Sequence, residues 1–250
     1  MKIGGRAQAD PRLPAALAAG VAVPGDTLCI VHGGGDEVSA VQRRLGLEPR
    51  FSGGRRVTSA EDLEVVRMVL SGTINKRLVA ALISRGVNAA GISGEDARLF
   101  MARATDPETM GRVGGDLTVH AALVHHLLAS GFVPVISPLA RDADDPLGAG
   151  LNVNGDDAAA ALAAAIGADE LVFVADVPGV LDDGTLLPVI DRDRAASLIA
   201  SGVAAGGMAA KLEAAMQALA GGAGRVRITG LEGIGDPSAG TRITNSLLPA

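Results

Sequence analysis

The sequence predicts an α/β fold built around a mostly parallel β-sheet, and two observations support this prediction. First, short apolar runs rich in β-branched residues alternate with longer stretches of helical periodicity, which is typical of βαβ units. Second, each apolar run is bounded by glycine, proline, aspartate or serine, as buried strands usually are. The expected strands are 27–31, 89–92, 132–136, 170–174 and 225–229, with a very short one at 1–3.

Helical patterns fill the intervals between these strands. Ser59, followed three residues later by Asp62, predicts a capping box at a helix start. Residues 51–57 predict a small hairpin, and the polar segments 103–115 and 141–150 predict loops, the second of which could connect two lobes. Further helices are expected at 38–45, 75–84, 119–128, 157–166 and 208–219.

Composition argues against several classes of function. The formal net charge is −6 and there is no basic run, whereas nucleic-acid binding needs clustered lysine and arginine. No apolar stretch approaches the roughly 18 residues of a membrane span, and no secretory signal is evident. The single cysteine, Cys29, lies in an apolar run and is expected to be a buried thiol. We therefore expect a cytoplasmic protein that binds neither nucleic acid nor membrane.

The histidines do not predict a metal site. His125 and His126 are adjacent and so face different directions on a helix, while His120 lies five residues before His125 rather than four. We therefore expect no metal-ligating residues.

The strongest functional signal is the run His32-Gly33-Gly34-Gly35, which stands between an expected strand and an expected helix. Consecutive glycines let backbone N–H groups approach an anion without a Cβ in the way, and a helix N-terminus favours negative charge. The run indicates an anion-binding turn, although a plain tight turn could use the same residues. It matches neither the dinucleotide-binding nor the P-loop pattern. We expect His32 to stabilise the turn rather than act as a base.

Two further segments carry basic residues beside glycines. Lys2 precedes Gly4 and Gly5 and could place an ammonium next to an anion, or could be a solvated lysine. An arginine fixed after the glycines at 53–54 is suited to bind a carboxylate through two parallel hydrogen bonds. Because adjacent arginines usually point to opposite sides, at most one of the pair at 55–56 should do so.

Polar residues also mark the second half of the chain. Asn152 and Asn154 alternate and so can face one side of an extended segment. Asp156 would either cap the following helix or hold nearby lysines by charge pairing. Lys211 is expected in the first turn of a helix, where a cation is unfavourable unless an anion is present; an exposed lysine is the alternative. The turn at 175–181 follows a strand and could contact a nucleotide.

Together, and in this order, these motifs resemble the amino-acid kinase superfamily, and the N-acetylglutamate kinases in particular. The resemblance runs through nearly the whole chain. It rests on KIGG at 2–5, VHGGG at 31–35, GRRVT at 54–58, NK at 75–76, GISG at 91–94, NVNGD at 152–156, ADVPGVL at 175–181 and GGMAAK at 206–211. It implies a three-layer αβα sandwich with two lobes: residues 1–150, which bind the amino acid and dimerise, and residues 151–250, which bind ATP.

The reaction of this family moves the γ-phosphoryl group of ATP to the side-chain carboxylate of N-acetyl-L-glutamate, a step of arginine biosynthesis. By resemblance, Lys2 and Lys211 would neutralise the transferring group and Asp156 would orient both lysines. Arg56 and Asn152 would hold the α-carboxylate of the substrate. Mg²⁺ would bridge the ATP phosphates with few direct protein ligands.

The resemblance also assigns backbone contacts. N–H groups of Gly33 and Gly34, together with those of Gly4 and Gly5, would hold phosphate and carboxyl oxygens. The residues that would bind ATP are Gly4, Gly5, Asp176, Gly179, Leu181, Gly207 and Met208.

One departure concerns the N-terminus. The family's first strand usually has several residues before the catalytic lysine, whereas only Met1 precedes Lys2. The sequence also lacks the N-terminal extension helix that is linked with arginine-inhibited hexamers in this family. A homodimer without strong arginine feedback is therefore expected.

Other functions compete with this one. A related kinase acting on carrier-protein-bound glutamate or aminoadipate is the nearest, but such relatives tend to have serine where Gly35 stands. A non-catalytic amino-acid or nucleotide sensor of the same fold is a second alternative, which the joint presence of Lys2, Asp156 and Lys211 disfavours. A uridylate or carbamate kinase fits less well, because Arg56 and Asn152 suit an α-carboxylate.

Overall fold

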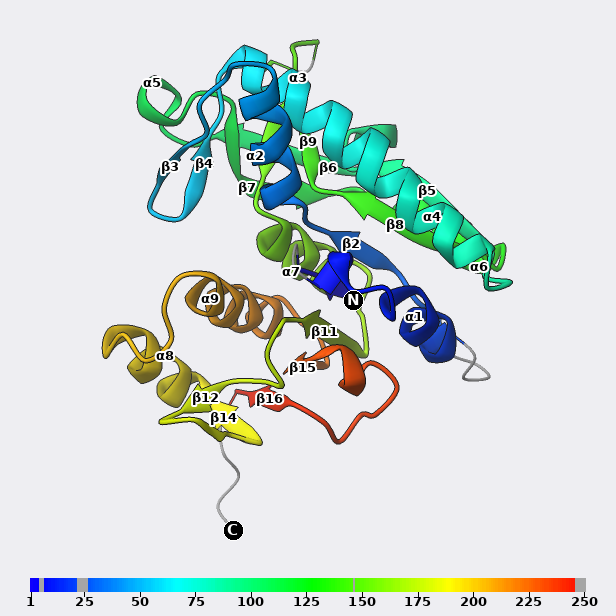
Figure 1. Cartoon of the computed structure of the whole chain (residues 1–250), viewed down its shortest axis with the longest axis vertical. Coiled ribbons are helices and arrows are strands. Elements are labelled where there is room, and N and C mark those ends of the chain that lie inside the picture. The colour runs from blue at the N-terminus through cyan, green and yellow to red at the C-terminus, as the bar shows by residue number, and fades with distance from the viewer. Residues whose placement is uncertain (5–6, 22–26, 146, 246–250) are drawn as a thin grey trace.

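The computed structural model describes residues 1–4, 7–21, 27–145 and 147–245 (Figure 1). Its centre is an eight-stranded sheet with the order β14-β16-β15-β11-β1-β2-β8-β5. Neighbouring strands in this sheet are parallel except β15 and β16, which confirms the α/β class and the mostly parallel sheet. The strands are β1 (Lys2–Ile3), β2 (Ile30–His32), β5 (Ala89–Ser93), β8 (Val133–Ser137), β11 (Glu170–Val174), β14 (Val189–Asp191), β15 (Arg225–Thr229) and β16 (Thr241–Thr244).

Helices cover both faces of this sheet, as a three-layer sandwich requires. One face packs against α1 (Leu13–Val21), α3 (Ala60–Arg67) and α4 (Asn75–Ile83). The other packs against α6 (Ala122–Ala129), α7 (Gly155–Ala165) and α9 (Gly207–Ala220). Strand residues alternate between the two cores because successive side chains point to opposite faces.

This alternation is clearest on two strands. On β2, Ile30 joins the core under α1, α3 and α4, and Val31 joins the core under α7. On β11, Val172 packs on the first side and Phe173 on the second. Both faces of the sheet are thus buried, which explains why these strands are almost continuously apolar.

A second, smaller sheet closes into a barrel of β6 (Phe100–Ala104), β7 (Val113–Val119), β9 (Leu139–Asp142) and β10 (Leu151–Val153). The predicted loop 103–115 is therefore wrong, since it holds the end of β6, the short helix α5 (Pro107–Met110) and the start of β7. Its glycines mark a close approach of strands: a Cβ on Gly114 would lie 2.9 Å from Ala102 Cβ. The predicted loop 141–150 joins the antiparallel neighbours β9 and β10 within this barrel.

Several predicted boundaries shift. β7 runs through Val119, so the helix expected at 119–128 begins only at Ala122. Because α9 begins at Gly207, Lys211 lies just beyond its first turn rather than within it. The capping box at Ser59 and Asp62 is confirmed, and so is the hairpin, formed by β3 (Arg50–Ser52) and β4 (Arg55–Val57).

A long helical run crosses one face of the sheet (Figure 1). The π-helical segment η2 (Met68–Ile74) joins α3 directly to α4, where two separate helices were expected. The remaining elements are α2 (Gly35–Arg44), α8 (Arg192–Ala200), β12 (Leu181–Asp182), β13 (Thr185–Leu186), and the 3-10 turns η1 (Ala7–Ala9), η3 (Asp96–Arg98) and η4 (Leu231–Gly233).

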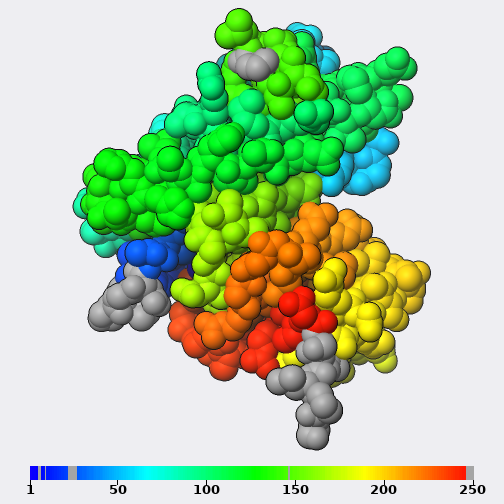
Figure 2. All heavy atoms as spheres, turned by 180° about the vertical axis from the view of Figure 1, so that it is seen from behind, coloured from blue at the N-terminus to red at the C-terminus, as the bar shows by residue number. Residues whose placement is uncertain are grey.

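The eight-stranded sheet takes strands from both predicted lobes. Seen from behind, the yellow-green segment that includes α7 lies between the green part of the chain and the orange and red part (Figure 2). The division into lobes at residue 150 stays a prediction. Within the described ranges, every helix is too short or too polar to cross a lipid bilayer.

Candidate active site

Predicted functional residues meet where β1 and β2 end and α7 begins. These strands are parallel neighbours at the middle of the sheet, so the turns that follow them emerge at the same edge. Ligands of open α/β sheets bind at such carboxyl ends. Gly155 at the start of α7 is close to both strands: a Cβ there would lie 3.4 Å from Lys2 Cε and 3.6 Å from the His32 carbonyl oxygen.

Asp156 lies between two lysines at this point. Lys2 Nζ is 2.8 Å from Asp156 Oδ1, and Lys211 Nζ is 3.5 Å from Asp156 Oδ2. All three side chains are largely buried, with exposed fractions of 7%, 12% and 8% for Lys2, Lys211 and Asp156. Burial lowers the pKa of Lys2; Asp156 opposes this effect and Lys211 adds to it. Two buried cations that share one carboxylate leave a positive surplus, which suits an anionic ligand.

Asp156 does not cap α7. The capping residue is Asn154, whose Oδ1 accepts hydrogen bonds from the backbone N–H groups of Asp156 at 2.7 Å and Asp157 at 3.3 Å. The Asp156 carboxylate is therefore directed at the lysines. Of the two roles considered for Asp156, the geometry favours charge pairing.

The glycine turns differ from expectation in their hydrogen bonds. Gly33 N–H donates to Ile3 O at 3.0 Å, and Gly4 N–H donates to Val174 O at 3.1 Å. These two groups are thus engaged in the sheet and are not open donors for phosphate. Among the described residues none accepts a hydrogen bond from the Gly34 N–H, so this group is an open donor. Gly5 lies outside the described residues.

His32 is a neutral part of the turn. Its side chain is fully buried, with Nδ1 2.9 Å from Gly33 O and Nε2 3.2 Å from Asn75 Nδ2. Burial lowers the pKa of His32 to about 4. A histidine that donates from Nδ1 and accepts at Nε2 stabilises the turn, as expected, and is poorly suited to act as a base at neutral pH.

Arg56 on the hairpin is buried without an ionic partner. Its guanidinium donates from Nη2 to Gly35 O at 2.8 Å and to Ser39 Oγ at 2.7 Å, and the Phe51 ring lies 4.8 Å away. No carboxylate of the described residues lies within ion-pair distance of it. By contrast, Arg55 pairs with Asp157 at 2.8 Å. Of the adjacent arginines, only Arg56 offers an unpaired buried charge.

Thr58 links Arg56 to Asn152. Its hydroxyl donates to the Arg56 carbonyl at 3.0 Å and accepts from Asn152 Nδ2 at 3.0 Å. Thr58 is fully buried. Thr58 belongs to the motif at 54–58, but nothing local in the sequence indicates that its partner is Asn152.

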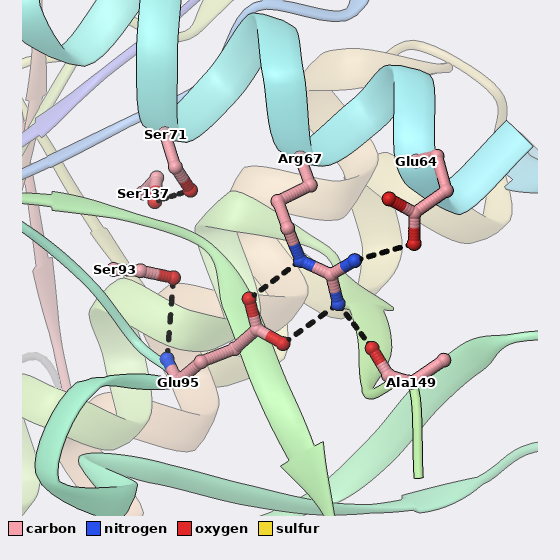
Figure 3. A network of polar contacts seen from close by, with 7 residues as sticks. All are labelled: Glu64, Arg67, Ser71, Ser93, Glu95, Ser137 and Ala149. Carbon is pink, nitrogen blue, oxygen red and sulfur yellow. Dashed lines mark hydrogen bonds and ion pairs between the residues drawn. The ribbon is translucent and has the colours of Figure 1, made fainter.

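A second network fixes the strand that carries Asn152. Arg67 of α3 donates to Glu64 at 2.7 Å, to both oxygens of Glu95 at 2.9 and 3.1 Å, and to the Ala149 carbonyl (Figure 3). Ala149 lies just before β10. Gly150 has φ +88°, and a Cβ there would lie 2.5 Å from Glu95 Oε1. The chain entering β10 is therefore held tightly against α3.

A cavity of about 230 Å³ lies between the glycine turn at 33–35, the hairpin and the start of α7. Val38, Val66 and Leu70 form an apolar wall beside the polar groups. The predicted site residues that line it are Lys2, Gly33, Gly34, Arg56, Asn152 and Asp156. The cavity can thus hold a small molecule with apolar carbons and more than one negative charge.

Those residues predicted to bind ATP that the structure describes lie outside this cavity. Gly207 and Met208 open α9, and the Gly207 carbonyl accepts from Lys211 Nζ at 3.3 Å. Gly179 packs so closely that a Cβ would lie 2.7 Å from Thr241 Oγ1. Asp176 follows β11 on an exposed turn, and Leu181 opens β12. Their contact with a nucleotide stays a prediction.

Comparison with known proteins agrees with this fold. Residues 1–230 match the model of the amino acid kinase family. The acetylglutamate kinase of Chloroflexus aurantiacus is 44% identical over 250 residues, which covers 99% of this chain and 97% of that protein. The acetylglutamate kinase of Methanopyrus kandleri is 47% identical over 219 residues, which covers 84% and 88%.

A solved structure has a similar fold. A protein of Streptococcus mutans UA159 superposes with a TM-score of 0.86 at 29% identity, covering 98% of this chain and 97% of that one. The likeness therefore extends over nearly the whole fold. The chain belongs to the amino acid kinase family, and within it to the acetylglutamate kinases.

Proposed function

We propose that the protein transfers the γ-phosphoryl group of ATP to the side-chain carboxylate of N-acetyl-L-glutamate, as a step of arginine biosynthesis. The observation that carries this proposal is the buried Lys2–Asp156–Lys211 cluster beside the cavity that holds Arg56. The relatives named acetylglutamate kinase, 44% and 47% identical over most of the chain, support the same activity.

N-acetyl-L-glutamate matches the charges of the cavity. One carboxylate would lie on Arg56 and Asn152, which supply a buried cation and an amide. The other would reach the lysine cluster and the open N–H of Gly34. The acetyl group and methylenes would pack against Val38 and Leu70 of the apolar wall.

In the reaction, an oxygen of the side-chain carboxylate attacks the γ-phosphorus, and the bond to the bridging oxygen of ADP breaks. The product is an acyl phosphate. Such transfers need positioning and charge neutralisation more than covalent help. Lys2 and Lys211 would neutralise the transferring group on its oxygens, and Asp156 would keep both ammonium groups in place.

ATP would lie on the Lys211 side of Asp156. Gly207 and Met208 would contact its phosphates, whereas the Gly4 N–H is already bonded to Val174 O and would not donate to them. Asp176, Gly179 and Leu181 would form the remaining nucleotide contacts. We place Gly5 in the same group on sequence alone.

Mg²⁺ supplies additional charge neutralisation on the ATP phosphates when bound. In the part of the chain that the structure describes, no three His, Cys, Asp or Glu side chains come together in a way that could hold a metal ion. Asp156, the buried carboxylate of the site, is occupied by two lysines. These residues fit an ion that is carried mainly by the nucleotide.

The expected homodimer and the cytoplasmic location belong to the same proposal. The N-terminal lobe would form the dimer contact. Sedimentation of the purified protein as a species of twice the chain mass would support the dimer, and sedimentation as a monomer would contradict it.

The activity can be tested by trapping the product. The protein is incubated with ATP, Mg²⁺ and N-acetyl-L-glutamate, and hydroxylamine converts any acyl phosphate to a coloured hydroxamate. Glutamate, aspartate and carbamate serve as parallel substrates. We expect hydroxamate mainly from N-acetyl-L-glutamate. A folded protein that forms acyl phosphate from none of these substrates would contradict the catalytic proposal.

A further inference from the structure

A chain of buried side chains lies behind Arg56. Gln42 of α2 donates from Nε2 to Asp62 Oδ1 of α3 at 2.5 Å, and its Oε1 accepts from Arg56 Nη1. Gln42 is fully buried. A glutamine amide has one donating end and one accepting end. It can therefore serve these two partners in only one orientation.

Asp62 sets that orientation because it is ionised and can only accept. Its Oδ2 accepts from Ser59 N–H at 2.9 Å, and its Oδ1 accepts from Gln42. Burial by itself would raise the pKa of Asp62, but the hydrogen bonds from Ser59 and Gln42 outweigh it and hold the pKa below its ordinary value. The carboxylate therefore draws the NH₂ end of Gln42 and turns the oxygen of Gln42 toward Arg56.

Among the described residues, every group that accepts from Arg56 is neutral: Gln42 Oε1, Gly35 O and Ser39 Oγ. Asp62 is the nearest carboxylate along this chain of contacts, yet Gln42 stands between it and the guanidinium. The neighbouring Arg55 shows the alternative, since it pairs directly with Asp157. An arginine that is fixed but not neutralised keeps its full attraction for an arriving carboxylate.

We propose that Gln42 and Asp62 are positioning residues for the carboxylate-binding arginine. Asp62 fixes the direction of the Gln42 amide. Gln42 in turn fixes Arg56 while keeping the negative charge of Asp62 one side chain away from it. The inference rests on the proposed function, because it takes the α-carboxylate of N-acetyl-L-glutamate as the ligand of Arg56.

Asp62→Asn tests whether Asp62, acting through Gln42, holds Arg56 in place. The asparagine oxygen can still accept from Ser59, so the helix cap is kept, but its NH₂ group faces Gln42. Gln42 must then turn its oxygen toward residue 62 and present N–H groups to Arg56, where two donors repel. We expect the KM for N-acetyl-L-glutamate to rise roughly 10- to 100-fold. The kcat and the KM for ATP should stay near those of the unchanged protein.

Gln42→Glu combined with Asp62→Asn tests whether the negative charge must be kept away from Arg56. The asparagine now donates to one oxygen of the carboxylate introduced at position 42, and the other oxygen accepts from Arg56, so the hydrogen-bonded chain is restored. The negative charge, however, now lies directly on Arg56. We expect the stability to recover toward that of the unchanged protein, while the KM for N-acetyl-L-glutamate stays raised because the arginine is neutralised.

Gln217→Glu is the matched control, because it makes the same change on an exposed position of α9. It should leave the KM for both substrates unchanged. If Asp62→Asn does not fold, Gln42→Leu serves in its place, since it removes both hydrogen bonds without adding a charge. It should raise the KM for N-acetyl-L-glutamate in the same way.

Binding of N-acetyl-L-glutamate is also measured by calorimetry. This measurement separates the proposed phosphoryl transfer from the proposed positioning role of Gln42 and Asp62. If the unchanged protein forms no acyl phosphate but binds the ligand, and Asp62→Asn weakens that binding, the proposed reaction fails and the positioning role stands. If the unchanged protein is active and Asp62→Asn alters neither KM nor affinity, the positioning role is wrong. A double variant that binds as tightly as the unchanged protein would overturn the charge-spacing role.

Discussion

Lys2 Nζ lies 2.8 Å from Asp156 Oδ1, although Lys2 is on the first strand of the sheet and Asp156 opens a helix much later in the chain. The same carboxylate also contacts Lys211 on α9 at 3.5 Å. One buried acid therefore fixes two cations that come from distant elements. Any change in the packing of β1, α7 or α9 should affect the same cluster.

Replacing Lys211 by methionine should lower turnover by about 10²- to 10³-fold, the usual cost of removing one group that stabilises charge in a transition state. Circular dichroism should show an unchanged fold. Lys76→Met is the control, because Lys76 is exposed and donates to Gly91 O. Near-normal turnover of Lys211→Met in the hydroxamate assay would remove Lys211 from the site.

Gly34 and Gly35 should respond differently to alanine. Gly34 has φ +151°, and a Cβ there would lie 2.2 Å from Ile74 Cδ1, whereas a Cβ on Gly35 meets only Arg56 Nη2 at 3.9 Å. We expect Gly34→Ala to lower the free energy of unfolding by about 1–3 kcal/mol and Gly35→Ala to change it by less than about 0.5 kcal/mol. Urea unfolding of both variants measures the difference. Equal stabilities would show that the turn is less tightly packed than these distances imply.

Thr58→Val should weaken substrate binding. Valine has the shape of threonine but cannot bridge the Arg56 carbonyl and Asn152 Nδ2. Losing the hydroxyl leaves buried polar groups unpaired, which costs about 1–3 kcal/mol. We expect a raised KM for N-acetyl-L-glutamate with an unchanged KM for ATP, and substantial rescue in Thr58→Ser. If valine and serine variants have the same KM as the unchanged protein, Thr58 does not orient Asn152.

His32 should make the protein sensitive to acid. Its pKa of about 4 in the folded state lies below the ordinary 6.5, so the unfolded state binds more protons between these two values. The contribution of His32 to stability is therefore complete above pH 6.5 and is lost as the pH falls toward 4. The loss amounts to roughly 3 kcal/mol.

His32→Gln removes this titration. We expect the free energy of unfolding to depend less steeply on pH between 4 and 6.5 in the variant than in the unchanged protein. Carboxylates titrate in both proteins, so the difference between the two curves isolates His32. Parallel curves would mean that His32 is not held neutral.

The central sheet could be predicted because the residues within and beside each strand indicate that strand without reference to the rest of the chain. The strands at 170–174 and 225–229 have the predicted bounds, since each is a short run that contains β-branched residues and has turn residues on both sides. The capping box could be predicted for the same reason, since Ser59 and Asp62 lie three residues apart in the sequence. The barrel could not be predicted in this way. Gly114 is a glycine within a strand because Ala102, on a neighbouring strand, lies too close to leave room for a Cβ, and the local sequence does not show this contact.

The site could also be predicted only in part, because some of its contacts join residues that are far apart in the sequence. Lys2, Asp156 and Lys211 were proposed from motifs, and the structure brings them together. The N–H of Gly33 was expected to face a ligand, but it donates to Ile3, because β1 and β2 are neighbours in the sheet. Gln42 carried no signal at all. Its importance depends on two partners, Arg56 and Asp62, that only the folded chain places beside it.

The most direct test of the central claim is a crystal structure of the protein with N-acetyl-L-glutamate, Mg²⁺ and a non-hydrolysable ATP analogue. We predict that the α-carboxylate lies on Arg56 and Asn152, and that the γ-phosphoryl group lies between Lys2 and Lys211 and faces the side-chain carboxylate. A complex in which the amino acid lies elsewhere, or in which the γ-phosphoryl group contacts neither lysine, would contradict the account.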